Sequence, residues 1–292
     1  RDEVARSINS EVKGGRGSPH GGVFLDIASR RSAEYIRRRL PSMYHQFKEL
    51  AGVDITAMPM EVGPTCHYAM GGIRVDADTE ATTVPGLFAA GEVSGGMHGA
   101  NRLGGNSLSD LLVFGRRAGM AASDFAEGRT GSPTVAETEV AAVVNEATEP
   151  LGRDSGESPY DLQHDLQDTM QKLVGIIRTE SELTSALGEL DKLDERAGRL
   201  AVSGPRTYNP GWNLATDLPA MLTVSRLVTK GAIIRQESRG GHTRDDYPKA
   251  DPEFGKVNLV QRVTPDGEFT LDPEPIPQMP AELRALFEED TH

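Results

Sequence analysis

Residues 98–108 read HGANRLGGNSL, and from Ser107 onward the chain takes on a helical pattern. Apolar and small residues recur there at helical spacing: Leu108, Leu111, Leu112 and Gly115. Asn106 or Ser107 is a suitable N-cap for this helix. Gly104 and Gly105 let the backbone approach a flat ligand closely, and the N–H groups of the first helical turn stabilise a negative charge on such a ligand. The sequence therefore predicts a ligand-binding loop at the start of a helix.

Two blocks upstream of this loop carry related signals. Residues 64–73 read PTCHYAMGGI, and residues 85–92 read PGLFAAGE. The apolar run 86–90 predicts a strand that ends just before Glu92. Ligands of α/β folds bind beyond the carboxyl ends of strands, so Glu92 is placed to accept hydrogen bonds from sugar-like hydroxyl groups.

His67 and Arg102 form a second candidate group. A histidine is a tunable hydrogen-bond donor and an arginine is a permanent forked cation, and together they are typical of a clamp for a dicarboxylate. The residues alone leave structural alternatives open. The Gly-Gly pairs could be turns, His67 an internal hydrogen-bonding group, Glu92 a cap, and His98 either a support of the Arg102 loop or a packing residue. Arg1 opens a helix, where a cation is unfavourable, so it is either a placed residue or an accident of the chain start.

Composition limits the function classes. The chain has 31 Lys+Arg against 44 Asp+Glu and a net charge of −13, which disfavours nucleic acid as a partner. No apolar run reaches the roughly 18 to 20 residues of a membrane span, so we expect no direct membrane insertion. The single cysteine, Cys66, has no metal-ligand spacing around it; we predict a buried thiol, no metal site and a reducing, cytoplasmic setting.

The pattern divides the chain into four parts, with boundaries at 1–63, 64–128, 129–240 and 241–292. The first opens with a helix from Asp2, and the third carries no readable chemistry and predicts a small antiparallel helical bundle. In the fourth part, Pro265-Asp266-Gly267 indicates a hairpin. The other expected elements are a strand at 23–27 and helices at 32–51 (interrupted by Pro41), 158–173, 183–193, 218–234 and 281–289.

These blocks resemble the flavoprotein subunits of the succinate dehydrogenase and fumarate reductase family, including its L-aspartate oxidase relatives. The resemblance rests on HYAMGGI, GLFAAGE and HGANRLGGNSL in the family's order, and it extends to ESRGGHTR at residues 237–244. It implies an α/β plus α fold: the C-terminal part of a Rossmann-like, FAD-binding flavoprotein. The four parts then become the end of a capping domain, the returning segment of the FAD domain, a helical domain and a tail.

The resemblance also implies roles for individual residues. In the implied reaction, succinate loses a hydride to the flavin and a proton to an arginine, and fumarate results. An arginine gives up a proton reluctantly, so neighbouring groups must pass the proton on. Residues 238–244 are expected to make structural polar contacts rather than to act in catalysis. The implied assignments are Arg1 as the catalytic proton carrier, His67 and Arg102 as substrate binders, and Glu92, Ser107 and Leu108 as FAD contacts.

Partners and alternatives follow from the same resemblance. In the family, electrons pass through an iron–sulfur subunit to quinone, and membrane anchor subunits hold the complex on the cytoplasmic side of the cell membrane, as in respiratory complex II and the tricarboxylic acid cycle. Succinate dehydrogenase is the leading prediction, followed by fumarate reductase, L-aspartate oxidase and an inactive fragment. The family's N-terminal GxGxxG motif and its FAD-linking histidine are not among these 292 residues. We therefore expect a C-terminal half that holds FAD weakly alone.

Overall fold

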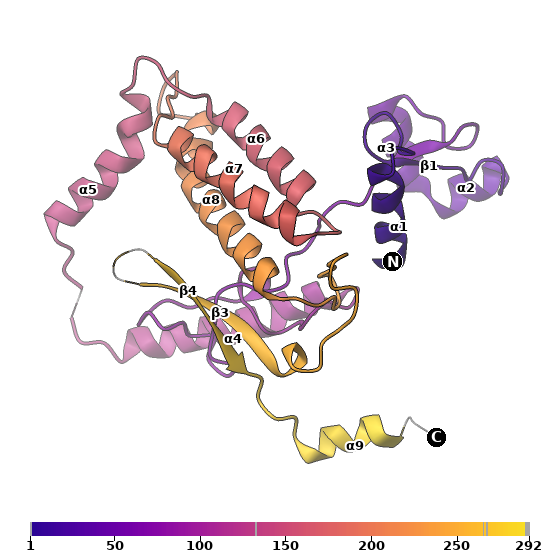
Figure 1. Ribbon diagram of the computed structural model, residues 1–292. Helices are drawn as coiled ribbons and strands as arrows, with labels where there is room; N and C mark the ends of the chain where they lie inside the picture. Colours follow the sequence, from indigo (N-terminus) through magenta and orange to yellow (C-terminus); the bar gives the residue numbers. More distant parts are fainter. Residues whose placement is uncertain (1, 132, 265, 267, 290–292) are drawn as a thin grey trace. The chain divides into compact units, whose positions relative to one another are not determined.

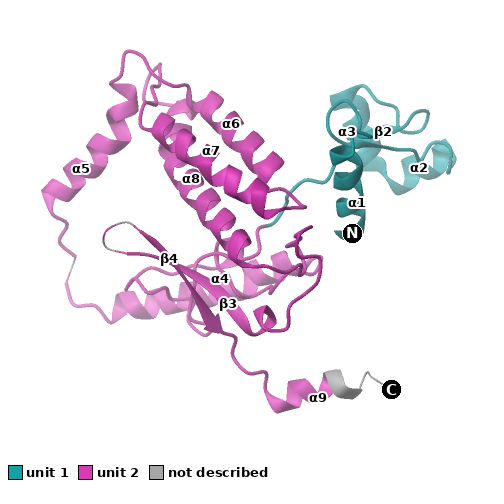
Figure 2. Ribbon diagram, viewed as in Figure 1, with its two compact units in different colours: residues 1–68 teal, residues 69–292 magenta. Residues whose placement is uncertain are grey.

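The computed structural model describes residues 2–131, 133–264, 266 and 268–289 (Figure 1). They divide into two compact units, Arg1–Tyr68 and Ala69–His292 (Figure 2). Arg1, the predicted proton carrier, lies outside the described residues. The four-part division from the sequence stays a prediction.

The first unit is a small α/β body built around one apolar cluster. The predicted helix over 32–51 is confirmed with its interruption: Ser32 caps one helix, and Pro41 occupies the first turn of the next. Ile36, Ile55 and Met60 form the buried centre. The elements are α1 (Asp2–Lys13), β1 (Val23–Leu25), α2 (Ala33–Arg39), α3 (Pro41–Ala51) and β2 (Met60–Val62), with β1 and β2 antiparallel.

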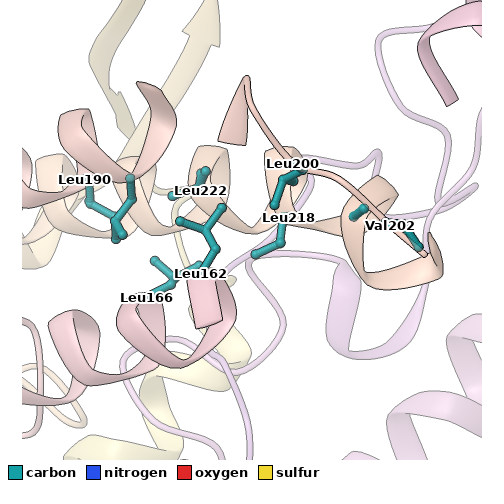
Figure 3. Packing of buried hydrophobic residues seen from close by; sticks show 9 residues of the cluster. Leu162, Leu166, Leu190, Leu200, Val202, Leu218 and Leu222 are labelled. Atoms are coloured by element: carbon teal, nitrogen blue, oxygen red, sulfur yellow. The ribbon is translucent and has the colours of Figure 1, made fainter. Parts of the chain in front are cut away.

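Three helices of the second unit form the predicted bundle, and they lie side by side in Figure 1. They are α6 (Pro159–Leu173), α7 (Glu180–Ala197) and α8 (Pro210–Ile234). The predicted cap Ser158 is confirmed, because its hydroxyl accepts a hydrogen bond from the Asp161 N–H group. Thr179 and Glu182 add a capping box at the start of α7. Figure 3 shows the buried leucines that these helices share.

The start of α8 was predicted wrongly. We expected a helix from Leu218, but it begins at Pro210, with Asn209 as its cap. Pro219 lies inside the helix. A proline in the first turn fits the helix without loss, whereas an internal proline usually ends one, so the sequence pointed to a later start.

The second unit also contains further helices and a hairpin outside the bundle. The predicted hairpin is present as two antiparallel strands with Val263 opposite Phe269, although residues 265 and 267 of its predicted turn lie outside the described residues. No helix in the described ranges is long and apolar enough to cross a membrane. The elements are η1 (Gly91–Val93), α4 (Asn106–Glu127), α5 (Glu137–Thr148), η2 (Glu149–Leu151), η3 (Phe254–Lys256), β3 (Val257–Val263), β4 (Phe269–Pro275) and α9 (Ala281–Glu289).

Candidate functional site

In the second unit, the end of the HYAMGGI block lies beside the segment that directly follows the GLFAAGE block. Ile73 pairs with Ser94 in a parallel bridge: the Ile73 N–H donates to the Val93 carbonyl at 2.8 Å, and the Ile73 carbonyl accepts from Gly95. A Cβ atom at Gly72 would lie 2.2 Å from the Val93 oxygen, so only glycine permits this approach. The end of the HYAMGGI block is therefore joined through its backbone to residues 93–95, which directly follow the GLFAAGE block.

The Glu92 side chain binds the backbone of the HYAMGGI block. Its Oε1 atom accepts a hydrogen bond of 3.0 Å from the Ala69 N–H group. Glu92 lies in the short helix η1 rather than directly after a strand. The predicted strand over 86–90 is wrong for the described residues, because a turn at its start leaves only Phe88 paired, with Ala81. The carboxylate is exposed, so its second oxygen can meet a ligand.

Arg102 lies in the loop between η1 and α4 and is buried, with 7% of its surface exposed. Its Nη1 atom donates to the Leu103 carbonyl. Ahead of it, His98 contacts the buried carboxylate of Asp110 on α4, with 3.3 Å between Nε2 and Oδ2. This contact agrees with the interpretation of His98 as a support of the Arg102 loop.

The start of α4 differs in one detail from the prediction. Its N-cap is Gly105, with φ +86°, and not Asn106 or Ser107, because a glycine adopts this left-handed conformation without strain. No side chain caps this end within the described residues. Ser107 is half-buried and Leu108 is exposed. The Asn106 and Leu108 N–H groups donate to the Leu103 and Gly105 carbonyls at 3.2 Å, so backbone groups rather than a side chain cover part of this helix start.

The predicted site residues fall into three groups. The loop around η1 and the start of α4 carry Glu92, Arg102, Ser107 and Leu108, all in the second unit. His67 is exposed and belongs to the first unit. Arg1 forms the third group by itself, outside the described residues.

Cys66 is exposed, so its predicted burial is wrong. It lies in the segment 63–69, which forms neither helix nor strand. The described residues contain no cluster of three or more His, Cys, Asp or Glu that could hold a metal ion.

Two buried acids near α4 were not singled out from the sequence. One is Asp110, the partner of His98 in the Arg102 loop. The other is Glu80, and burial raises its pKa above the usual range, with Arg117 acting in the opposite direction. A single acid in a helix or turn carries no sequence signal of burial, so only the structure reveals these two.

The segment 238–244 makes the structural polar contacts predicted for it. Arg244 is fully buried and donates to the carbonyls of Ala232 and Ile233 at the end of α8. It also donates to both carboxylate oxygens of Asp246 at 2.8 Å, and these hydrogen bonds lower the pKa of Asp246 to about 2. The segment therefore closes the carboxyl end of α8.

Comparisons with known proteins define the class first. Residues 1–108 match the family described as "FAD binding domain", and residues 163–285 match "Fumarate reductase flavoprotein C-term". These matches place the chain in the class of FAD-binding flavoproteins. It belongs to the family of succinate dehydrogenase and fumarate reductase flavoprotein subunits, as the sequence blocks predicted.

Three similar proteins illustrate this membership. A CoM/CoB-type fumarate reductase subunit of Methanothermobacter marburgensis is 42% identical over 90% of this chain and 47% of its own length. The "Succinate dehydrogenase flavoprotein subunit" of Coxiella burnetii is 35% identical over 86% and 45%. The structure "Mycobacterium smegmatis Sdh1 in complex with UQ1" is 56% identical over 99% of this chain and 49% of that one, with a TM-score of 0.91. Another match is named L-aspartate oxidase. The chain spans about half the length of these relatives.

FAD is the cofactor, and the residues of the second unit fit it in part. A Cβ atom built at Gly104 or Gly105 would meet nothing within 4 Å, so the loop before α4 is open to a flat ring. The uncapped start of α4 suits a negative charge on that ring, and the exposed Glu92 carboxylate suits hydroxyl groups.

Proposed function

We propose that this chain is the part of a succinate dehydrogenase flavoprotein subunit that binds the dicarboxylate and one side of the flavin. The observation that carries the proposal is the gathering of three sequence blocks around the start of α4: 69–73, 91–95 and 98–108. They bring an exposed carboxylate, a buried guanidinium and an uncapped helix start into one part of the second unit. This combination suits a cofactor with hydroxyl groups and a ring that becomes negatively charged, beside an anionic substrate.

The residues take the following roles in this proposal. FAD, when bound, supplies the site that accepts a hydride from the substrate. Arg102 binds a substrate carboxylate through its forked guanidinium, and His67 binds and polarises the other carboxylate. Glu92 binds the hydroxyl-bearing chain of the cofactor, while Ser107 and Leu108 contact its ring from the start of α4. Arg1 carries the proton that leaves the substrate carbon.

Fumarate reductase is the second candidate, because the relative with 42% identity carries that name. The same residues serve both directions, since they bind dicarboxylates that differ by two hydrogens. L-Aspartate oxidase is the third candidate and is also named among the relatives. An aspartate substrate would bring an ammonium group, which an arginine and a histidine do not favour as neighbours.

We further propose that the protein acts in a complex with membrane anchor subunits and an iron–sulfur subunit, which pass the electrons to quinone. Support for the quinone comes from two relatives: one is named "8-methylmenaquinol:fumarate reductase flavoprotein subunit", and a similar structure was solved with UQ1. On this proposal, the protein associates peripherally with the cytoplasmic side of the membrane through its partner subunits.

Arg102→Gln in the intact holoprotein tests the role of the buried cation. Two charge-assisted hydrogen bonds to a carboxylate contribute about 3 kcal/mol together, so we expect kcat/KM for succinate to fall by about 10²-fold. FAD content, measured from flavin absorbance, stays unchanged. Arg206→Gln, at an exposed position in the loop before α8, is the matched control and leaves turnover as it was. Near-normal succinate oxidation by Arg102→Gln would refute the assignment.

A further inference from the structure

A tight turn at residues 239–242 reaches from the tail toward the Arg102 loop. Arg239 and His242 form an isolated antiparallel bridge, with their N–H and carbonyl groups paired at 2.8 and 3.0 Å. Gly240 and Gly241 are the two residues at its tip. The tip is glycine at both positions, so its backbone can lie directly against another chain segment.

The turn lies against Ala100, two residues ahead of Arg102. The Gly241 N–H group donates to the Ala100 carbonyl at 2.9 Å. A Cβ atom at Gly240, whose φ is +58°, would lie 2.3 Å from the Ala100 oxygen and 2.8 Å from its Cβ atom. No side chain fits there without displacing one of the two backbones. The contact therefore requires glycine at position 240, and it fixes the distance between the turn and the backbone of Ala100.

Charged groups hold the base of the turn from one side. Arg239 forms a forked pair with the fully buried Glu237, at 2.9 to 3.1 Å, and also donates to the Asp251 carbonyl. Arg235, at the end of α8, donates to the same Glu237 carboxylate at 2.7 Å. Burial alone would raise the pKa of Glu237, but the hydrogen bonds from Arg239, Asp251 and Arg235 leave it lowered. The carboxylate therefore stays charged and holds both arginines.

His242 holds the base from the other side. Its Nδ1 atom lies 3.0 Å from Nη1 of Arg178, and its Nε2 atom lies 2.9 Å from the Arg235 carbonyl. A guanidinium only donates hydrogen bonds, so Nδ1 must accept and Nε2 must carry the proton. Arg178 belongs to the connection between α6 and α7, where its N–H donates to the Thr243 carbonyl. His242 thus joins the turn to the helical bundle.

We infer that the turn 239–242 positions Arg102, holding the loop that carries it at a fixed place against the helical bundle. His98 and Asp110 secure the loop on the α4 side, and the Gly240–Ala100 contact secures it on the side of the bundle. Gly240, Gly241 and His242 are positioning residues in this scheme, since none of them needs to touch the substrate. The inference rests on the proposed function for the role of Arg102, while the mechanical connection stands independently.

Gly240→Ala in the intact protein tests the connection directly by hydrogen–deuterium exchange. The added methyl group pushes Ala100 away, so we expect amides in residues 98–106 to exchange at least about tenfold faster, which corresponds to local opening. Amides of α7 keep their protection. The matched control is Gly188→Ala, an exposed helical position where an added Cβ meets nothing within 4 Å, and it leaves residues 98–106 unchanged. Unchanged exchange at 98–106 in Gly240→Ala would overturn the inference.

A pair of variants at His242 covers the case in which Gly240→Ala does not fold. His242→Phe removes both hydrogen bonds, whereas His242→Gln keeps one acceptor and one donor. We expect faster exchange at 98–106 in His242→Phe, with most of the protection restored in His242→Gln. Equal exchange in both variants and the wild type would overturn the inference.

Kinetics separate positioning from simple destabilisation. In the folded, FAD-loaded protein, a displaced Arg102 binds the substrate poorly, so KM for succinate rises about tenfold in Gly240→Ala but not in Gly188→Ala. A purely structural role would lower the yield of folded protein and leave KM unchanged, which would contradict positioning. If the wild type does not oxidise succinate at all, the proposed function fails, and the exchange result alone decides on the connection.

Discussion

The helical bundle and helix α4 belong to the same unit, but the bundle buries its leucines whereas α4 exposes apolar side chains. In the bundle, leucines from α6, α7 and α8 are fully buried against one another (Figure 3). On α4, Asp110 is the buried residue, and Leu112 exposes 78% of its surface. The bundle carries its own stability, whereas α4 presents apolar surface next to the candidate site and gains little from contacts within the described residues.

The difference explains where chemistry can be placed. A helix that buries one face is held in place by side-chain packing, so the residues on that face must be apolar and must fit their neighbours. The loop ahead of α4 is instead held by the backbone contact of Gly240 and Gly241 with Ala100 and by polar groups, such as the His98–Asp110 pair. Loops held in this way leave backbone groups available for ligands. Stability and ligand binding are therefore expected to respond to different sets of substitutions.

The largest expected effect on stability comes from the bundle. Leu218→Ala removes a fully buried side chain and leaves a cavity, so we expect the free energy of unfolding to fall by about 2–5 kcal/mol. Leu112→Ala on α4 is the matched control, and a change within about 0.5 kcal/mol is expected for this exposed position. Urea unfolding of both variants measures the difference. Equal losses of unfolding free energy in the two variants would contradict the difference between the bundle and α4.

Arg244→Met is expected to have an intermediate effect. The change keeps the apolar stem but removes the hydrogen bonds to the Ala232 and Ile233 carbonyls, which costs about 1–3 kcal/mol. It also releases Asp246, whose pKa of about 2 should rise toward its ordinary value. Thermal unfolding and titration of the carboxyl group measure the two results. Arg206→Met, at an exposed site, serves as the control, and a loss as large there would argue against the buried contacts.

The smallest expected effect is a pH dependence that comes from His242. Burial lowers its pKa, and the charges of Arg178, Arg244 and Arg235 act in the same direction against the hydrogen bond to the Arg235 carbonyl. In the unfolded state the pKa of His242 is about 6.5, so the unfolded state binds more protons than the folded state. The stabilisation is complete above about pH 6.5 and is lost as the pH falls through the lowered pKa.

Unfolding measured between about pH 5 and 6.5 checks this dependence. That window lies above the titration of Asp246 and Glu237, whose pKa values are lowered. His242→Gln should flatten the slope in this window, since it removes the titrating ring. The same slope in the wild type and in the variant would assign the dependence to another group.

The sequence predicted local structure well where a cap and a periodic pattern coincide. Ser158 followed by Pro159 and regularly spaced leucines led to α6, and Pro41 led to the break between α2 and α3. For the site, the blocks predicted Glu92 and Arg102, and both belong to the same unit as α4. Their roles in binding stay predictions.

Contacts between distant segments could not be predicted in the same way. The Gly241 hydrogen bond to Ala100 joins two loops whose own sequences indicate only turns. The N-cap of α4 was misassigned because Asn106 and Ser107 are usual caps, while Gly105 takes the position through its left-handed backbone. The burial of Glu80 likewise depends on what packs over it rather than on its neighbours in sequence.

In the proposed function, the protein oxidises succinate at a flavin. The most direct test of this function is flavin absorbance of the intact holoprotein, followed without oxygen while succinate or L-aspartate is added. The proposed function predicts bleaching by succinate and none by L-aspartate. Bleaching by L-aspartate alone, or a purified protein without bound flavin, would contradict it.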